Sequence, residues 1–96
     1  MQIEFLEKAK RDLREIEDYL VQFYPSTARK FNDKLEEKLF LLVDFPYMYP
    51  EYEEDSYFRK MVFGDYLLFY TVEETNDLII IGRIIHSSRD IKSIDF

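Results

Sequence analysis

Three apolar runs in the second half of the chain constrain its fold more than any other feature. They cover residues 57–63, 66–72 and 78–86, and all three are rich in Ile, Val, Phe and Tyr. Turn-forming residues separate them: Gly64-Asp65 after the first run and Glu74-Thr75-Asn76-Asp77 after the second. This pattern predicts a β-hairpin followed by a third strand.

A two-residue turn between the first two runs also sets their register. It would place Arg59 opposite Tyr70 and Met61 opposite Leu68. Within the third run, the isolated glycine Gly82 predicts a bulge or a close approach of another group to the backbone.

The first half of the chain carries two helical patterns. Apolar residues recur at every third or fourth position over residues 6–23, which predicts an amphipathic helix with Asp12 on its solvated face. Tyr24-Pro25-Ser26 ends this helix, and Ser26 is expected to cap a second helix whose apolar stripe covers residues 28–42. Because the link is so short, the two helices are expected to form an antiparallel hairpin.

Two further segments complete the expected fold. Residues 1–5 are expected to form a short edge or pairing strand, and residues 45–56 a loop whose tyrosines either cover the core or form a recognition surface. We therefore predict one domain over residues 1–96, of class α+β and element order β-α-α-β-β-β. In it, the antiparallel helical hairpin packs on a mostly antiparallel sheet of about four strands.

Charge and composition exclude several kinds of site. The chain of 96 residues has a net charge of -7, and residues 51–96 hold five basic against ten acidic groups. An acidic surface repels polyanions and argues against a broad nucleic-acid footprint. Cysteine is absent and there is one histidine, so we expect no disulfide, no metal site and, without a glycine-rich phosphate loop, no nucleotide cofactor.

The start of the chain has neither the basic nor the apolar region of a signal peptide. No apolar span approaches the roughly 18 residues of a membrane helix. A cytoplasmic protein without membrane contact is expected.

The predicted order of elements is accompanied by several short motifs. They follow one another along nearly the whole chain. They are Ala9 and Ile16, Pro25-Ser26-Thr27-Ala28 with Phe31 and Leu35, Phe45-Pro46, Tyr49-Pro50, Tyr57-Phe58-Arg59, Tyr66-Leu67-Leu68-Phe69-Tyr70 and Ile84-Ile85-His86-Ser87-Ser88-Arg89-Asp90. Together they resemble the RelE/ParE superfamily of toxins from type II toxin-antitoxin modules, also called plasmid-stabilisation proteins.

The resemblance implies growth inhibition by one of two mechanisms. ParE-like toxins block DNA gyrase by binding and have no known catalytic centre, whereas RelE-like toxins cut messenger RNA on the ribosome. Our prediction is the ParE-like gyrase inhibitor. The alternatives are a RelE-like ribosome-dependent endoribonuclease and a degenerate, non-toxic member that still binds an antitoxin.

If the chain is a nuclease, the candidate catalytic residues are His86, Arg59, Arg83 and Arg89, and the resemblance matches Arg59 and Arg89 to basic positions of the RNA-cutting branch. Metal-free RNA cleavage needs proton transfer and neutralisation of the phosphorane, which an imidazole and guanidinium groups supply. Each residue also has a structural interpretation. His86 would be a hydrogen-bonded strand end, Arg83 would pack its stem at the sheet edge, Arg89 would pair with Asp90, and Arg59 would stack on its cross-strand tyrosine.

The chain departs from the RNA-cutting branch at three positions. Met61 and Leu67 stand where that branch has a lysine and an arginine. The C-terminal tyrosine of that branch has no counterpart here, because its position falls near Asp95. The departures favour the ParE-like prediction because they remove positive charge.

The resemblance also implies a cognate antitoxin. Antitoxin segments are commonly acidic, as this chain is. The partner is therefore expected either to carry many Lys and Arg residues or to bind through apolar anchors such as the aromatic residues of 47–57.

Overall fold

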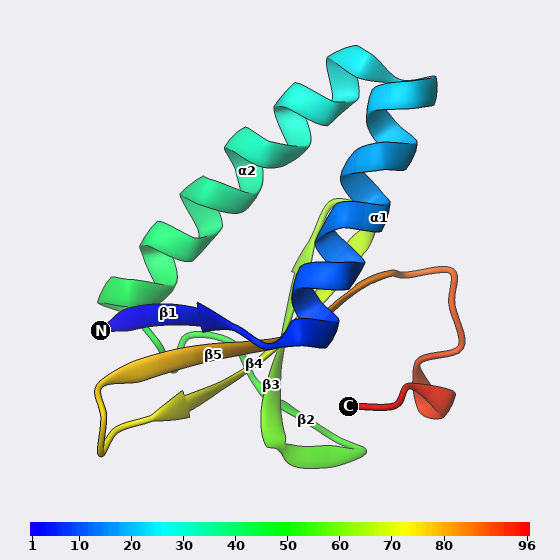
Figure 1. Cartoon of the computed structure of the whole chain (residues 1–96). Helices are drawn as coiled ribbons and strands as arrows, with labels where there is room; N and C mark the ends of the chain where they lie inside the picture. The colour runs from blue at the N-terminus through cyan, green and yellow to red at the C-terminus, as the bar shows by residue number, and fades with distance from the viewer.

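The computed structural model describes all 96 residues, and it confirms the α+β class with two helices packed on one face of a sheet (Figure 1). The elements, in chain order, are β1 (Gln2–Phe5), α1 (Glu7–Phe23), α2 (Pro25–Asp44), β2 (Glu51–Tyr52), β3 (Asp55–Phe63), β4 (Tyr66–Glu73), β5 (Leu78–His86) and the 3-10 turn η1 (Ile91–Ser93). The two helices form the expected antiparallel hairpin, whose connection lies away from the sheet (Figure 1). Neither helix is long and apolar enough to cross a bilayer.

The sheet has five strands rather than about four, in the order β1-β5-β4-β3-β2. The additional strand is β2, which lies within the segment expected to be a loop and pairs with β3. Strand β1 is an edge strand and pairs parallel to β5, whereas all other pairs are antiparallel.

The predicted hairpin register is correct: Arg59 lies opposite Tyr70 and Met61 opposite Leu68. The turn between β3 and β4 requires a positive φ, which is 56° at Gly64. Glycine adopts this conformation without a steric cost because it has no Cβ atom.

Both expectations for Gly82 hold. The pairing of β4 with β5 shifts at this point, because Phe69 faces Arg83 while the next residue, Tyr70, faces Ile81. A Cβ atom on Gly82 would lie 2.7 Å from Cε1 of Phe58. The bulge therefore carries the residue that leaves room for an aromatic ring.

Both faces of the sheet are covered by other parts of the chain. The helices cover one face, where the core includes Ala9, Phe31, Leu35, Met61 and Tyr70. The opposite face holds a second cluster formed by Tyr52, Phe58, Leu67, Phe69 and Ile85. Residues 87–96, which include η1, fold back over this second cluster and place Ile91, Ile94 and Phe96 against it.

Three expectations about the helices are corrected. Leu6 and Phe23, at the ends of the first apolar stripe, are exposed: Leu6 precedes the helix, with its amide bonded to Ile81 of β5, and Phe23 is the last residue of α1, at the connection to α2. Asp12 is buried rather than solvated. Ser26 does not cap α2: the N-cap is Tyr24, without a side-chain hydrogen bond, and Pro25 occupies the first helical position, where no N–H is needed.

Candidate functional site

A cavity of about 400 Å³ lies between α1 and the end of β5, and we call it the His86 cavity. Both helix and strand residues form its walls. They are Asp12, Glu15, Ile16, Tyr19, Tyr66, Ile84, Ile85, His86, Ser88 and Arg89. The cavity therefore brings together two of the four candidate residues, His86 and Arg89.

The His86 ring is exposed but held by its neighbours. Its Nδ1 atom accepts a hydrogen bond from the backbone N–H of Ser88 at 3.1 Å and lies 2.8 Å from the Ser88 hydroxyl. The ring also packs edge-on against Tyr66, with 5.3 Å between centroids. Because Nδ1 accepts from the backbone, the neutral ring carries its proton on Nε2. In that tautomer the outward nitrogen donates, so it is not ready to act as a base.

Tyr66 and Arg89 complete the wall beside the histidine. Burial raises the pKa of Tyr66 above its ordinary value of 10.0, and the charge of Asp65 acts in the same direction. The phenol therefore stays protonated at neutral pH. The Arg89 side chain is exposed and makes no hydrogen bond or ion pair within the chain, so the expected pair with Asp90 is not formed.

Arg83 is occupied by a buried ion pair. Its Nε donates to Oδ2 of Asp12 at 2.7 Å, and its Nη2 donates to Oδ1 at 3.0 Å. Asp12, only 6% exposed, also accepts from the backbone N–H of Ile84 at 3.0 Å. These hydrogen bonds raise the pKa of Arg83. The guanidinium is therefore neutralised by Asp12, and its third contact is the carbonyl oxygen of Asp95 at 2.6 Å.

Arg59 lies in a different part of the molecule. Its Nη1 donates to the carbonyl oxygen of Tyr49 at 2.6 Å, and its guanidinium lies over the ring of Tyr47, 5.0 Å from the centroid. The stacking partner is thus Tyr47, not the cross-strand Tyr70. Tyr66 of β4 lies opposite Phe63 of β3 on one side and His86 of β5 on the other, so the three residues lie side by side across the sheet. Arg59 precedes Phe63 by four residues along β3, which is a distance of about 13 Å.

The geometry therefore divides the four candidates. His86 and Arg89 line one cavity, Arg83 is paired beside it, and Arg59 lies well away along β3. The cavity also contains the carboxylates of Asp12 and Glu15. A phosphate at this place would meet one unpaired guanidinium, not a cluster of cations.

Asp12, expected from the sequence to be solvated, is instead a buried residue beside the site. A signal was present, because Asp12 lies three residues after Ala9 and four before Ile16, at the border of the buried stripe. A second signal was Arg83, the one charged residue within the otherwise apolar β5, since a charge in such a strand needs a partner.

Comparisons with known proteins agree with this fold. The family described as "ParE toxin of type II toxin-antitoxin system, parDE" matches residues 3–91. No curated protein sequence is a significant match.

Several solved structures are similar over nearly the whole chain. One from the chromosomal ParDE toxin-antitoxin system of P. aeruginosa has a TM-score of 0.72 and 22% identity, and the alignment covers 90% of this chain and 95% of that one. The isolated RelE toxin of E. coli has a TM-score of 0.66 and 18% identity over 93% of this chain and 86% of its own. The RelBE2 toxin-antitoxin complex of Mycobacterium tuberculosis gives 0.63 and 21%, over 88% and 95%.

These structural neighbours share the fold of helical hairpin and sheet at low sequence identity. The family match extends over almost all of the described elements, from β1 to η1. The chain therefore belongs to the ParE toxin family of type II toxin-antitoxin systems.

Proposed function

We propose that this toxin acts as a ParE-like inhibitor that binds DNA gyrase and performs no chemistry of its own. The observation that carries the proposal is the dispersal of its basic groups. Arg83 is neutralised by Asp12, and Arg59 is held by the Tyr49 carbonyl far from His86. A nuclease of this type needs several cations preorganised around one phosphate, whereas inhibition by docking does not. The proposal places the toxin in the cytoplasm, where its target works.

A supercoiling assay with purified gyrase tests the proposal. The toxin is expected to block supercoiling, and His86→Ala and Arg89→Ala are expected to keep that effect within about threefold, because neither residue performs chemistry. Normal supercoiling at a large molar excess of folded toxin would refute it.

The RelE-like activity is the second candidate, and one observation favours it. His86, Arg89 and Tyr66 line a common cavity, so an acid and a cation do lie together. Under this candidate, purified toxin cuts mRNA on programmed ribosomes, and His86→Ala or Arg89→Ala reduces the rate by about 100-fold or more. If neither assay gives an effect, the degenerate, non-toxic member becomes the preferred description.

We also propose that the chain pairs with a cognate antitoxin. The family is defined by two-component systems, and the similar structures include toxin-antitoxin complexes. Co-expression with the product of the adjacent reading frame is expected to restore growth and to give a stable complex on size-exclusion chromatography.

A further inference from the structure

An apolar groove separates α2 from the elements beside it. Its volume is about 410 Å³, and its walls include Ile3 and Phe5 from β1, Leu13 from α1, and Leu39 and Val43 from α2. These side chains are only partly covered by the fold. The groove is therefore an apolar surface that a further chain segment can bury.

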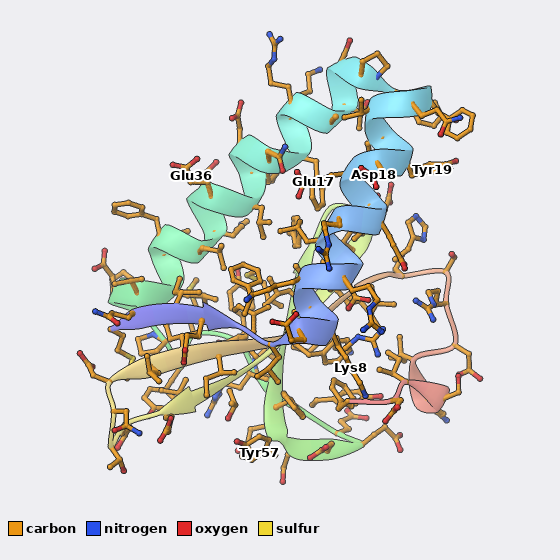
Figure 2. All side chains as sticks on the ribbon, in the orientation of Figure 1. Lys8, Glu17, Asp18, Tyr19, Glu36 and Tyr57 are labelled. Atoms are coloured by element: carbon orange, nitrogen blue, oxygen red, sulfur yellow. The ribbon has the colours of Figure 1, made fainter.

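Phe40 extends this surface outward along α2. It is 74% exposed, more than any other large hydrophobic residue of the chain. Phe40 borders both the groove and a second hollow of about 530 Å³ on the same helix. Besides Phe40 and Leu41, that hollow is lined only by carboxylates: Asp33, Glu36, Glu37 and Asp44. Glu36 points outward from α2, away from α1 (Figure 2).

The carboxylates are not neutralised within the chain. No ion pair involves α2, and neither hollow is lined by a Lys or Arg side chain. Asp33 and Glu37 are four residues apart and repel each other, and Asp44 lies at the helix end where a negative charge opposes the dipole. This row of carboxylates is therefore open to positive groups of a partner.

The negative charge of these four carboxylates restricts which kind of molecule can bind over them. A second copy of this chain would bring a net charge of -7 and the same carboxylates, and a nucleic acid would bring phosphates. Both are repelled. A segment that combines positive side chains with an apolar one complements the surface.

We propose that this face of α2 binds a basic, amphipathic segment of the cognate antitoxin, with Lys or Arg side chains on the carboxylates and an apolar anchor beside Phe40. The inference rests on the proposed antitoxin pairing and adds the chemistry of the contact. Of the two expectations for the antitoxin, it selects the basic segment over an anchor on the aromatic residues of 47–57. Tyr47 is already engaged by Arg59 and Glu74, and Tyr52 is buried, which leaves Tyr57 as the one tyrosine of that segment that is more than half exposed.

Titration calorimetry with the purified product of the adjacent reading frame tests the inference. Phe40→Ala is expected to weaken binding at least tenfold. The double variant Glu36→Gln with Glu37→Gln is expected to weaken it about fivefold at about 0.1 M salt and much less at about 0.5 M, because screening removes the attraction.

The matched control is Lys34→Gln with Lys38→Gln. It also removes two charges from α2, but these lysines line neither hollow. The control is expected to change affinity less than twofold. All of these positions are exposed except Lys38, which is partly exposed, and urea unfolding checks that each variant is folded.

Each other outcome has a distinct meaning. Wild-type affinity in both the Phe40 and the Glu36/Glu37 variants overturns the inference and leaves the antitoxin pairing intact. If the adjacent product does not bind the wild-type toxin, the proposed pairing fails and the inference with it. Self-association that Phe40→Ala abolishes would assign the groove to a second copy and also overturn the inference.

Discussion

At the scale of single residues, Asp12 has the largest structural role among the charged groups. It accepts three hydrogen bonds, two from Arg83 and one from the amide of Ile84. Strand β1 pairs with β5 only as far as Ile81, so the carboxylate supplies a partner for the β5 backbone beyond that point. One side chain of α1 thus joins the helix to the strand that leads into the His86 cavity.

Replacing Asp12 by Ala is expected to destabilise the protein by about 3–5 kcal/mol, because the Arg83 charge and a backbone amide lose their partner in a nearly dry place. Urea unfolding followed by circular dichroism measures the change. Asp18→Ala, an exposed change on the same helix, is the control and should stay within about 0.5 kcal/mol. An equally small effect for Asp12→Ala would show that the ion pair does not hold the strand.

Tyr70 gives a prediction about alkaline pH. Its ring is fully buried and its hydroxyl donates to the carbonyl oxygen of Pro46 at 2.7 Å. Burial raises the pKa of Tyr70 above its ordinary value of 10.0. Above about pH 10 the unfolded chain therefore ionises first and binds fewer protons than the folded one. The stabilisation is complete below pH 10 and is lost as pH rises beyond it.

The measurement is the free energy of unfolding between about pH 8 and pH 11.5, for the wild type and Tyr70→Phe. The variant is expected to lose about 1 kcal/mol at pH 8, from the missing hydrogen bond, and to show a shallower alkaline decline. An unchanged slope would place the alkaline sensitivity elsewhere, for example at Tyr66.

At the scale of elements, the segment over residues 87–96 acts as the cover of the second sheet face. Phe96 stacks on Phe58 with 4.4 Å between ring centroids and meets Phe69 edge-on at 5.2 Å. Asp95 accepts hydrogen bonds from Arg83 and Lys8 through its backbone carbonyl. The segment is therefore held by rings at its end and by cations from β5 and α1.

Phe96→Ala is expected to destabilise the protein by about 1–3 kcal/mol, since the ring is only partly buried, and to increase binding of a hydrophobic dye. Thermal unfolding and dye fluorescence measure both effects. Lys92→Ala, in the same segment but exposed, is the control. If Phe96→Ala matches the control in both assays, the second face does not need this cover.

The elements also show what the sequence can and cannot reveal. The β5 bounds, the hairpin register and the bulge at Gly82 followed from local patterns, because apolar runs, turn residues and an isolated glycine act over a few positions. The pairing of Asp12 with Arg83 joins residues 71 positions apart, and no local pattern carries that information. Strand β2, two residues long, is likewise defined only by its neighbour β3.

At the scale of the whole molecule, the same limit applies to the candidate site. Sequence motifs suggested His86, Arg59, Arg83 and Arg89 together, whereas the fold brings only His86 and Arg89 into one cavity. Which side chains meet depends on where α1 crosses the sheet and on the bulge in β5. Both are properties of the packed chain.

Net charge gives a prediction at this scale. With -7 at neutral pH and its cations dispersed, the toxin is expected to flow through a heparin column at about 0.1 M salt, because polyanion binding needs a basic surface. The elution volume measures this, with lysozyme, a strongly basic protein of similar size, as the retained control. Retention of the toxin would reveal a basic surface that favours the RNA-cutting candidate.

The parallel pairing of β1 with β5 also affects how the toxin is made. Residues 2–5 leave the ribosome early but must wait for residues 78–81 before they can join the sheet. Until then the helices can pack only on the β3–β4 hairpin, whose Met61, Phe63, Leu68 and Tyr70 belong to their core, and the place of β5 between β4 and β1 stays empty. The sheet and the His86 cavity are therefore complete only once synthesis has passed β5 and Arg89.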